Sequence, residues 1–217
     1  MLTPRGYISF SQMAMFEMSP EKYVEKYIYG KKERITQNMK YGSDLAEGLE
    51  DEESTGDPLL DLVMVKLPKY ERMDKVVEDR TGKKVFDPNE GEEWWLPLLA
   101  NGKDDIPILA KPDSAKQDYT AFYEYKTSVR PWNQKMADES GQITFYATAI
   151  WLANKGLPEA IELINVPLYY DAHGKLQPTG DLVRLPTKRT TADMIKMTGR
   201  IRKAWAGIKE LCKNELL

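Results

Sequence analysis

The sequence is poor in the residues that many catalytic and structural sites need. Its single cysteine, Cys212, cannot form a disulfide within the chain, and it excludes a zinc or iron–sulfur site built from cysteines alone. The single histidine, His173, lies in the predicted turn "DAHGK", so histidine-based catalysis is not expected. No GxxxxGK[ST] pattern occurs, so we predict no ATP site.

Long apolar runs and an excess of positive charge are also missing. No run approaches the roughly 18–20 apolar residues of a membrane span, and the N-terminal "MLTPRGYISFSQ" lacks the apolar core of a signal peptide. We therefore expect a cytoplasmic protein with no membrane partner. Lys and Arg number 31 against 34 Asp and Glu, a net charge of −3. A nucleic-acid partner would consequently need a local basic patch.

Three segments are basic enough to form such a patch. They are "GKKER" at residues 30–34, "RLPTKR" at residues 184–189, and a stripe on the last predicted helix made of Lys196, Arg200 and Lys203. Each of them, taken alone, is also typical of a solvated surface. If the substrate is DNA, at least one should border the active cleft, because phosphate contacts supply most nonspecific affinity.

The pattern of apolar residues predicts an α/β fold with a mixed sheet. Expected helices are two short ones within 9–30, then 37–53, 57–67, 133–155 and 190–213. Expected strands lie within 70–100, with a turn at Thr81-Gly82, then at 105–113 and 120–128 as a pair, and as a hairpin over 160–186 that turns at His-Gly. Residues 1–217 are predicted to be a single domain, with 57–104 as a candidate family-specific elaboration.

Two further positions are interpreted from their place in these elements. Cys212 falls in the apolar register of the last helix, which favours core packing over nucleophilic chemistry. Trp94 and Trp95 point to opposite faces of a strand, so we expect one of them in the core. The other could be exposed at the surface, could form a dimer contact, or could be a platform on which a base stacks.

The strongest candidates for chemistry are Asp113 and the Glu-x-Lys formed by Glu124 and Lys126. Side chains alternate along a strand, so Glu124 and Lys126 share a face, and Tyr123 and Tyr125 share the other. Two carboxylates supply the oxygen ligands that Mg²⁺ or Mn²⁺ prefers. A lysine beside them can orient or help deprotonate a water and stabilise charge during phosphodiester hydrolysis. The same letters also fit a solvated hairpin with a Glu–Lys pair.

The helix that follows supports the catalytic interpretation. Gln142 and Tyr146 lie four residues apart and therefore on one helical face. Gln142 precedes an apolar run at residues 143–152, where a buried amide would need a hydrogen-bond partner. The alternative is a polar residue that is simply exposed.

Taken in order, these motifs resemble the RecB-like exonuclease branch of the PD-(D/E)XK nuclease superfamily. The matching stretches are "SFSQMAMFEMSPEKYVEKYIYG", "GSDLAEGLE" at 42–50, "KPD…YEYKTS" and "QITFY". Each motif is weak singly, but their order and spacing agree from Ser9 to about Lys213. The resemblance implies a restriction-endonuclease-like core with a mixed central β-sheet flanked by helices.

The resemblance also implies roles for individual residues. Asp113, Glu124 and the backbone carbonyl of Tyr125 would bind the metal, and Lys126 would be the catalytic lysine. Gln142 and Tyr146 match positions that orient the site and contact the DNA backbone.

The implied activity is that of a Mg²⁺- or Mn²⁺-dependent DNA nuclease, an exonuclease of recombination or repair type. Its partners would be DNA, as linear or single-stranded ends, and a recombination or helicase protein. The oligomeric state stays open, as do RNA and branched DNA as substrates.

The sequence departs from the family pattern at two positions. Ser19 stands where a cysteine normally precedes Pro20, so we predict no iron–sulfur cluster. The motif histidine falls on Ala46. Either Glu47 or Glu50 could replace it as a ligand, or neither could. The last case predicts the alternative function, a catalytically impaired nuclease-fold protein that binds DNA or serves in assembly.

Overall fold

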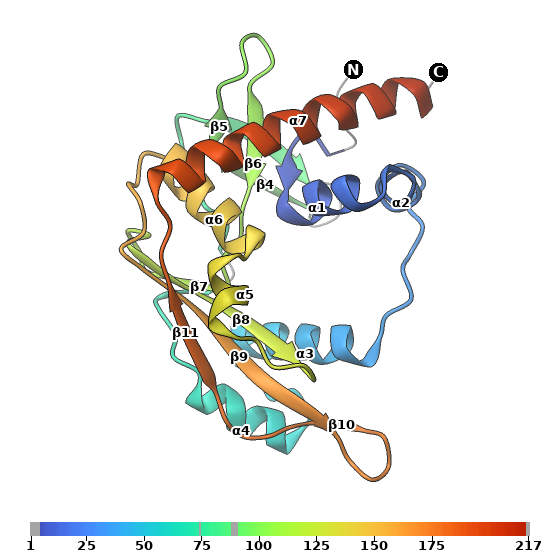
Figure 1. Ribbon diagram of the computed structural model, residues 1–217, viewed down its shortest axis with the longest axis vertical. Helices are drawn as coiled ribbons and strands as arrows, with labels where there is room; N and C mark the ends of the chain where they lie inside the picture. Colours follow the sequence, from blue (N-terminus) through green and yellow to red (C-terminus); the bar gives the residue numbers. More distant parts are fainter. Residues whose placement is uncertain (1–4, 74, 88–90, 216–217) are drawn as a thin grey trace.

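A mixed sheet with helices on both faces organises the molecule (Figure 1). The computed structural model describes residues 5–73, 75–87 and 91–215. The helices are α1 (Phe10–Met18), α2 (Pro20–Tyr23), the π-helical turn η1 (Val24–Ile28), α3 (Gln37–Asp51), α4 (Pro58–Lys66), α5 (Gln134–Asp138), α6 (Gly141–Leu152) and α7 (Thr191–Glu215). The predicted α/β class, with a mixed central sheet flanked by helices, is confirmed.

The central sheet has the order β10-β9-β8-β7-β2, and β11 also pairs with β9. Its strands are β2 (Arg72–Met73), β7 (Ser114–Ala115), β8 (Ala121–Ser128), β9 (Ala160–Tyr170), β10 (Leu176–Pro178) and β11 (Val183–Thr187). Strands β8 and β9 are parallel, and the other pairs are antiparallel. The parallel pair needs a crossover connection, which α5 and α6 provide. The predicted hairpin over 160–186 is confirmed.

Two smaller sheets lie beside the central one and correct two predicted pairings. Strand β6 (Ile106–Leu109) does not pair with β8; it pairs with β1 (Ile8–Ser9) and β5 (Leu98–Leu99). All four residues of β6 are buried, so the strand needs neighbours on both sides, and Pro112 then separates it from β7. The second small sheet pairs β3 (Lys83–Asp87) with β4 (Glu92–Leu96), so Thr81-Gly82 is a turn that precedes β3 and does not join two strands.

The helix predicted over 133–155 is divided into α5 and α6. Residues Glu139 and Ser140 separate them, and the Ser140 hydroxyl accepts a hydrogen bond from the Ile143 backbone N–H, 3.4 Å away. Serine is a favoured N-cap residue, so α6 begins here as a separate helix and does not continue α5. The break places Gln142 in the first turn of α6.

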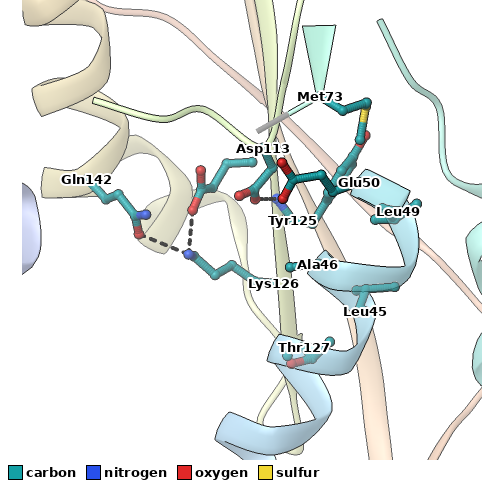
Figure 2. Close-up of a pocket in the computed structure, with 12 residues that line it drawn as sticks. Leu45, Ala46, Leu49, Glu50, Met73, Asp113, Tyr125, Lys126, Thr127 and Gln142 are labelled. Atoms are coloured by element: carbon teal, nitrogen blue, oxygen red, sulfur yellow. Dashed lines mark hydrogen bonds and ion pairs between the residues drawn. The ribbon is translucent and has the colours of Figure 1, made fainter. Parts of the chain in front are cut away.

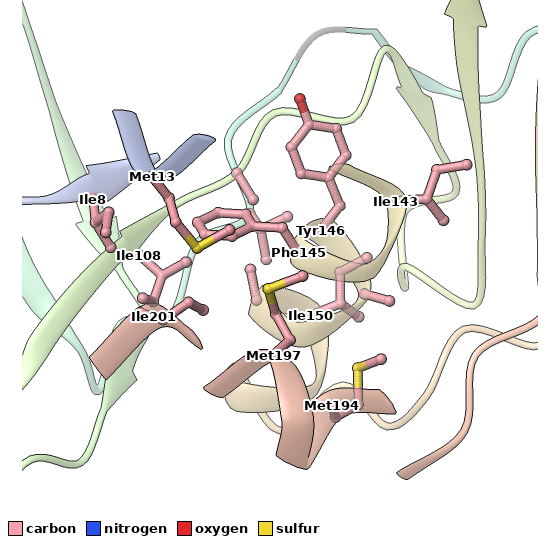
Figure 3. Packing of buried hydrophobic residues seen from close by; sticks show 14 of the residues in the cluster. Ile8, Met13, Ile108, Ile143, Phe145, Tyr146, Ile150, Met194, Met197 and Ile201 are labelled. Atoms are coloured by element: carbon pink, nitrogen blue, oxygen red, sulfur yellow. The ribbon is translucent and has the colours of Figure 1, made fainter. Parts of the chain in front are cut away.

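Two hydrophobic cores hold the helices against opposite faces of the sheet. The larger core packs α1, α6 and α7 around buried side chains such as Ile143, Phe145 and Ile201 (Figure 3). The second core packs α3 and α4 against β8, β9 and β10 through Leu45, Leu49 and other apolar residues. Strand β8 therefore has one helical layer on each side, and its alternating side chains enter different environments.

Several other expectations can now be compared with the structure. Cys212 is buried in the larger core, as predicted. Trp94 is buried and Trp95 is 38% exposed, which confirms their opposite faces. Residues 57–104 contribute strands to all three sheets, and their status as an elaboration stays a prediction. Across the part of the chain that the structure describes, no helix is both long enough and apolar enough to cross a membrane.

Candidate active site

A cavity of about 280 Å³ at the edge of the central sheet brings together most of the predicted site residues (Figure 2). Tyr146 and Glu47 do not line it. Strand β8 and the residue before β7 form one side of it, α3 forms another, and Gln142 reaches in from α6. The lining residues are Gly42, Leu45, Ala46, Leu49, Glu50, Met73, Asp113, Glu124, Tyr125, Lys126, Thr127 and Gln142. Residues distant in sequence thus converge where the motifs predicted a site.

Asp113 is held by the strand that carries the Glu-x-Lys. Ser114 pairs with Tyr123 in the β7–β8 ladder, so Asp113 lies one step beyond the last paired residue. Its carboxylate accepts a hydrogen bond from the Tyr125 backbone N–H at 2.6 Å. The side chain thus takes the place of a strand neighbour and is fixed beside Glu124. The Tyr125 hydroxyl, on the opposite face, donates to the Pro68 carbonyl at 2.6 Å.

A continuous chain of hydrogen bonds connects four predicted residues. Lys126 Nζ donates to Glu124 Oε1 at 2.5 Å and to Gln142 Oε1 at 2.9 Å. Gln142 Nε2 donates in turn to the Tyr146 hydroxyl at 2.8 Å. The predicted shared face of Glu124 and Lys126, and that of Gln142 and Tyr146, are confirmed. The half-buried amide of Gln142 has a hydrogen-bond partner on both its oxygen and its nitrogen.

Burial and charge act in opposite directions on this network. Glu124 is 1% exposed, and its burial raises the pKa of its carboxyl, while the charge of Lys126 opposes that effect. Burial also lowers the pKa of Lys126, but the charges of Glu124 and Asp113 together outweigh it, and the pKa of Lys126 is raised. The raised pKa of Lys126 favours its charged form beside Glu124, and the charge of Asp113 adds to that effect.

The donor set fits a hard divalent cation. Glu124 Oε2 is buried and, among the described residues, has no hydrogen-bond partner. A buried carboxylate oxygen without a partner is costly, and a cation would satisfy it. Within the described residues, however, no group of three or more His, Cys, Asp or Glu side chains could hold a metal ion. A cation here would have Asp113, Glu124 and a backbone carbonyl as protein ligands and would keep several waters.

The α3 side of the cavity shows which of the two acidic residues, Glu47 or Glu50, faces the site. Ala46 and Glu50 line the cavity, and Glu50 points into it from α3 (Figure 2). Glu47 does not line it: its carboxylate is exposed and accepts a hydrogen bond from the Ser43 hydroxyl at 3.0 Å. Residue 47 is rotated about 100° from residue 46, whereas residue 50 lies about one turn further along nearly the same face. The ligand role that the sequence offered to Glu47 therefore has no geometric support.

Two residues that support the site were missed by the sequence analysis. Asn165 on β9 donates to the Lys126 carbonyl at 2.8 Å and to the Ser128 hydroxyl at 2.9 Å, which holds the end of β8. Arg189 is buried and donates to the carbonyls of Ala137 and Ser140, so it braces the break between α5 and α6. Arg189 looked like part of a basic surface segment, and no pattern in the sequence separated it from its neighbours.

The predicted basic segments differ in how much charge they leave available. In 184–189, Arg184 forms an ion pair with Glu162 at 2.5 Å, and Arg189 is buried. On α7, Arg200 forms an ion pair with Glu17 at 2.6 Å. Residues 30–34 are exposed throughout. His173 lies in an exposed turn away from the residues that line the cavity, as expected.

Comparisons with known proteins bear on the fold. No protein-family model matches the chain, and no curated protein is similar to it in sequence. Among solved structures, the chain is similar to a phage-related exonuclease of Haemophilus somnus 129PT, with a TM-score of 0.49, 13% identity, and coverage of 94% of this chain and 83% of the other. It is also similar to a proposed exonuclease of Eubacterium rectale, with a TM-score of 0.50, 12% identity, and coverage of 96% and 82%. The second likeness shows that the chain has the fold of that structure.

Proposed function

We propose that this protein is a Mg²⁺- or Mn²⁺-dependent deoxyribonuclease, an exonuclease of the RecB-like branch of the PD-(D/E)XK superfamily. The observation that carries the proposal is the network in which Lys126 joins Glu124 to Gln142, beside Asp113, within one cavity. The sequence motifs and the fold shared with a proposed exonuclease support it. A recombination or repair role, and a helicase or recombination partner, follow from the resemblance alone.

The residues of the chain have distinct tasks in this proposal. Asp113 and Glu124 hold the cation, together with the Tyr125 carbonyl. The ammonium group of Lys126 has three N–H donors, and two of them are used by Glu124 and Gln142. The third can hold the attacking water or a phosphate oxygen and stabilise the charge that develops there. Tyr146 fixes the amide of Gln142, which keeps the lysine in place.

A bound Mg²⁺ or Mn²⁺ would supply the positive charge that polarises a phosphate oxygen and activates water. The overall reaction adds water across a phosphorus–oxygen bond and releases a phosphate and a hydroxyl end. The buried, unpartnered Oε2 of Glu124 is the feature of this chain that most requires such a cation.

The test compares two lysines of the same hairpin. Lys126→Ala should lower the hydrolysis of linear DNA in Mn²⁺ by roughly 10²–10³-fold, the usual loss when a stabilising donor is removed. Lys116→Ala is the control, because Lys116 is exposed in the turn between β7 and β8, outside the cavity. Equal activities for the two variants would contradict the proposal, as would full activity of the parent protein in a chelator.

The alternative function, a DNA-binding or assembly protein without catalysis, has one observation in its favour. Ala46 occupies the position of a family ligand, and the described residues contain no ready cluster of three ligands. Calorimetric titration with Mn²⁺ separates the two functions. Binding that is lost in both Asp113→Asn and Glu124→Gln supports the nuclease, and no Mn²⁺ binding by the parent protein supports the alternative.

A further inference from the structure

The connection between η1 and α3 is a basic segment that is exposed over its full length. Residues 30–36, called the strap here, have no regular secondary structure, and every residue from 29 to 40 is exposed. Figure 1 shows the strap as a long connection from the α2 region to the start of α3. Residues 30–40 carry four cationic side chains and one acidic one, in a chain whose net charge is −3. Local positive charge is therefore concentrated here.

Two of the three cations of the strap, Lys32 and Arg34, are available to a ligand. Lys31 forms an ion pair with Glu25, and Lys26 forms one with Glu33, which ties the strap to η1. Within the described residues, neither Lys32 nor Arg34 takes part in an ion pair or a side-chain hydrogen bond.

Two of the basic residues that the sequence singled out elsewhere, Lys188 and Lys196, have acidic neighbours. Lys188 shares a hollow with Glu159 and Glu162, and Lys196 shares one with Asp193 and Glu139. An approaching polyanion would be repelled by these carboxylates. The strap is thus the better site for phosphate contacts.

Apolar side chains accompany these cations. Tyr29 is 64% exposed, Ile35 is 70% exposed and Met39 is 49% exposed. Ile35 and Met39 line a shallow groove of about 640 Å³ at the start of α3, in which Lys40 forms an ion pair with Asp44. Exposed apolar residues between cations suit a strand with unpaired bases, because aromatic and apolar side chains contact base faces that a duplex keeps stacked.

The strap is continuous with the candidate active site along α3. Met39 precedes Ala46 by seven residues, which is nearly two full turns, so both lie on almost the same face of the helix. The separation along the helix axis is roughly 10 Å at 1.5 Å per residue. Gly42 lies between them at the rim, and its Cα is close enough to β8 that a Cβ there would be 3.2 Å from Thr127 Oγ1. A strand that follows this face reaches the cavity.

We propose that the strap and the first turn of α3 form the path by which a single-stranded DNA end enters the cavity. Lys32 and Arg34 contact phosphates, and Tyr29, Ile35 and Met39 contact bases. This inference rests on the proposed nuclease function, and it adds the strand state of the substrate and the surface that binds it.

The experiment measures DNA binding without cleavage. Fluorescence anisotropy with a labelled oligothymidine, in a chelator, compares the parent protein with Lys32→Ala/Arg34→Ala. The double variant should bind roughly tenfold more weakly, and the slope of log K against log salt should fall by about 1.4, since each phosphate contact on a single strand contributes about 0.7. The matched control is Lys196→Ala/Lys203→Ala, which removes two charges from α7 and should change neither quantity.

A second variant tests the contact with bases. Ile35→Ser/Met39→Ser should weaken binding of the single strand and leave binding of a duplex unchanged. The path is overturned if the strap variant binds like the parent protein, if the α7 control loses as much affinity, or if the serine variant affects duplex and single strand equally. All variants alter exposed residues, so their thermal unfolding midpoints should match that of the parent protein.

The outcome is distinguishable from failure of the proposed function. If Lys126→Ala abolishes cleavage while the strap variant binds normally, the nuclease stands and the path is wrong. If the strap variant loses binding while Lys126→Ala still cleaves, the path stands and the catalytic assignment is wrong.

Discussion

The cavity has one wall built from β8 and the first turn of α6 and a second wall built from α3, which the strap precedes in the chain. In the first wall, Lys126, Gln142 and Tyr146 form one hydrogen-bond network, and Arg189 braces the helix behind it. In the second, α3 is anchored through Leu45 and Leu49, but its first turn and the strap are exposed on all sides. Under the proposed function, the first wall would hold the catalytic side chains and the second would receive the substrate. Catalytic side chains must be fixed within a fraction of an ångström, whereas a surface that accepts varied DNA need not be so rigid.

The largest expected effect comes from removing the brace of the first wall. Arg189→Leu removes the charged hydrogen bonds that Arg189 donates to the carbonyls of Ala137 and Ser140, and it should lower the free energy of unfolding by about 3 kcal/mol although each carbonyl keeps a backbone donor. Urea denaturation measures it. Arg184→Leu is the control on the neighbouring strand β11, because its exposed ion pair with Glu162 is worth about 1 kcal/mol or less. Equal losses would mean that the first wall is not specially braced.

The next effect tests whether the network of the first wall serves catalysis. Gln142→Leu removes an acceptor from Lys126 and a donor from Tyr146, so DNA hydrolysis should fall about 10–100-fold, as for other supporting residues of metal sites. Gln134→Leu, whose amide donates to Asp138 and the Pro186 carbonyl, should keep full activity. Steady-state rates in Mn²⁺ decide between them, and full activity of Gln142→Leu would remove the network from the mechanism.

The sequence predicted the first wall better than the second. Strand alternation placed Glu124 and Lys126 together, and helical spacing placed Gln142 and Tyr146 together, because both depend on local geometry. The order of the strands was less predictable. Strand β6 was predicted to pair with β8 but pairs with β1, which is about a hundred residues away in the sequence. The local sequence does not specify which distant strand becomes its partner.

In the second wall, too, the sequence could not predict features that depend on tertiary packing. The sequence left Glu47 and Glu50 open, since the rotation of α3 about its axis depends on how Leu45 and Leu49 pack into the second core. In the first wall, the break at Ser140 was missed by the sequence analysis, although a serine just before an apolar run is a helix-start signal. Arg189 lay outside any local pattern, because its partners come from α5, α6 and β11 together.

The substitution with the smallest expected effect on stability lies in the second wall. It tests whether residues of α3 contribute to binding of the metal ion. Ala46 is exposed at the cavity, so Ala46→Glu should change the free energy of unfolding by no more than about 0.5 kcal/mol. It should strengthen Mn²⁺ binding by about tenfold, because an added carboxylate raises the affinity of a hard-cation site. Glu50→Gln should weaken that binding, and Glu47→Ala should leave it unchanged, since Glu47 faces away. Titration calorimetry gives all three values. If Ala46→Glu and Glu50→Gln both bind Mn²⁺ like the parent protein, α3 does not reach the cation, and the first wall alone holds it.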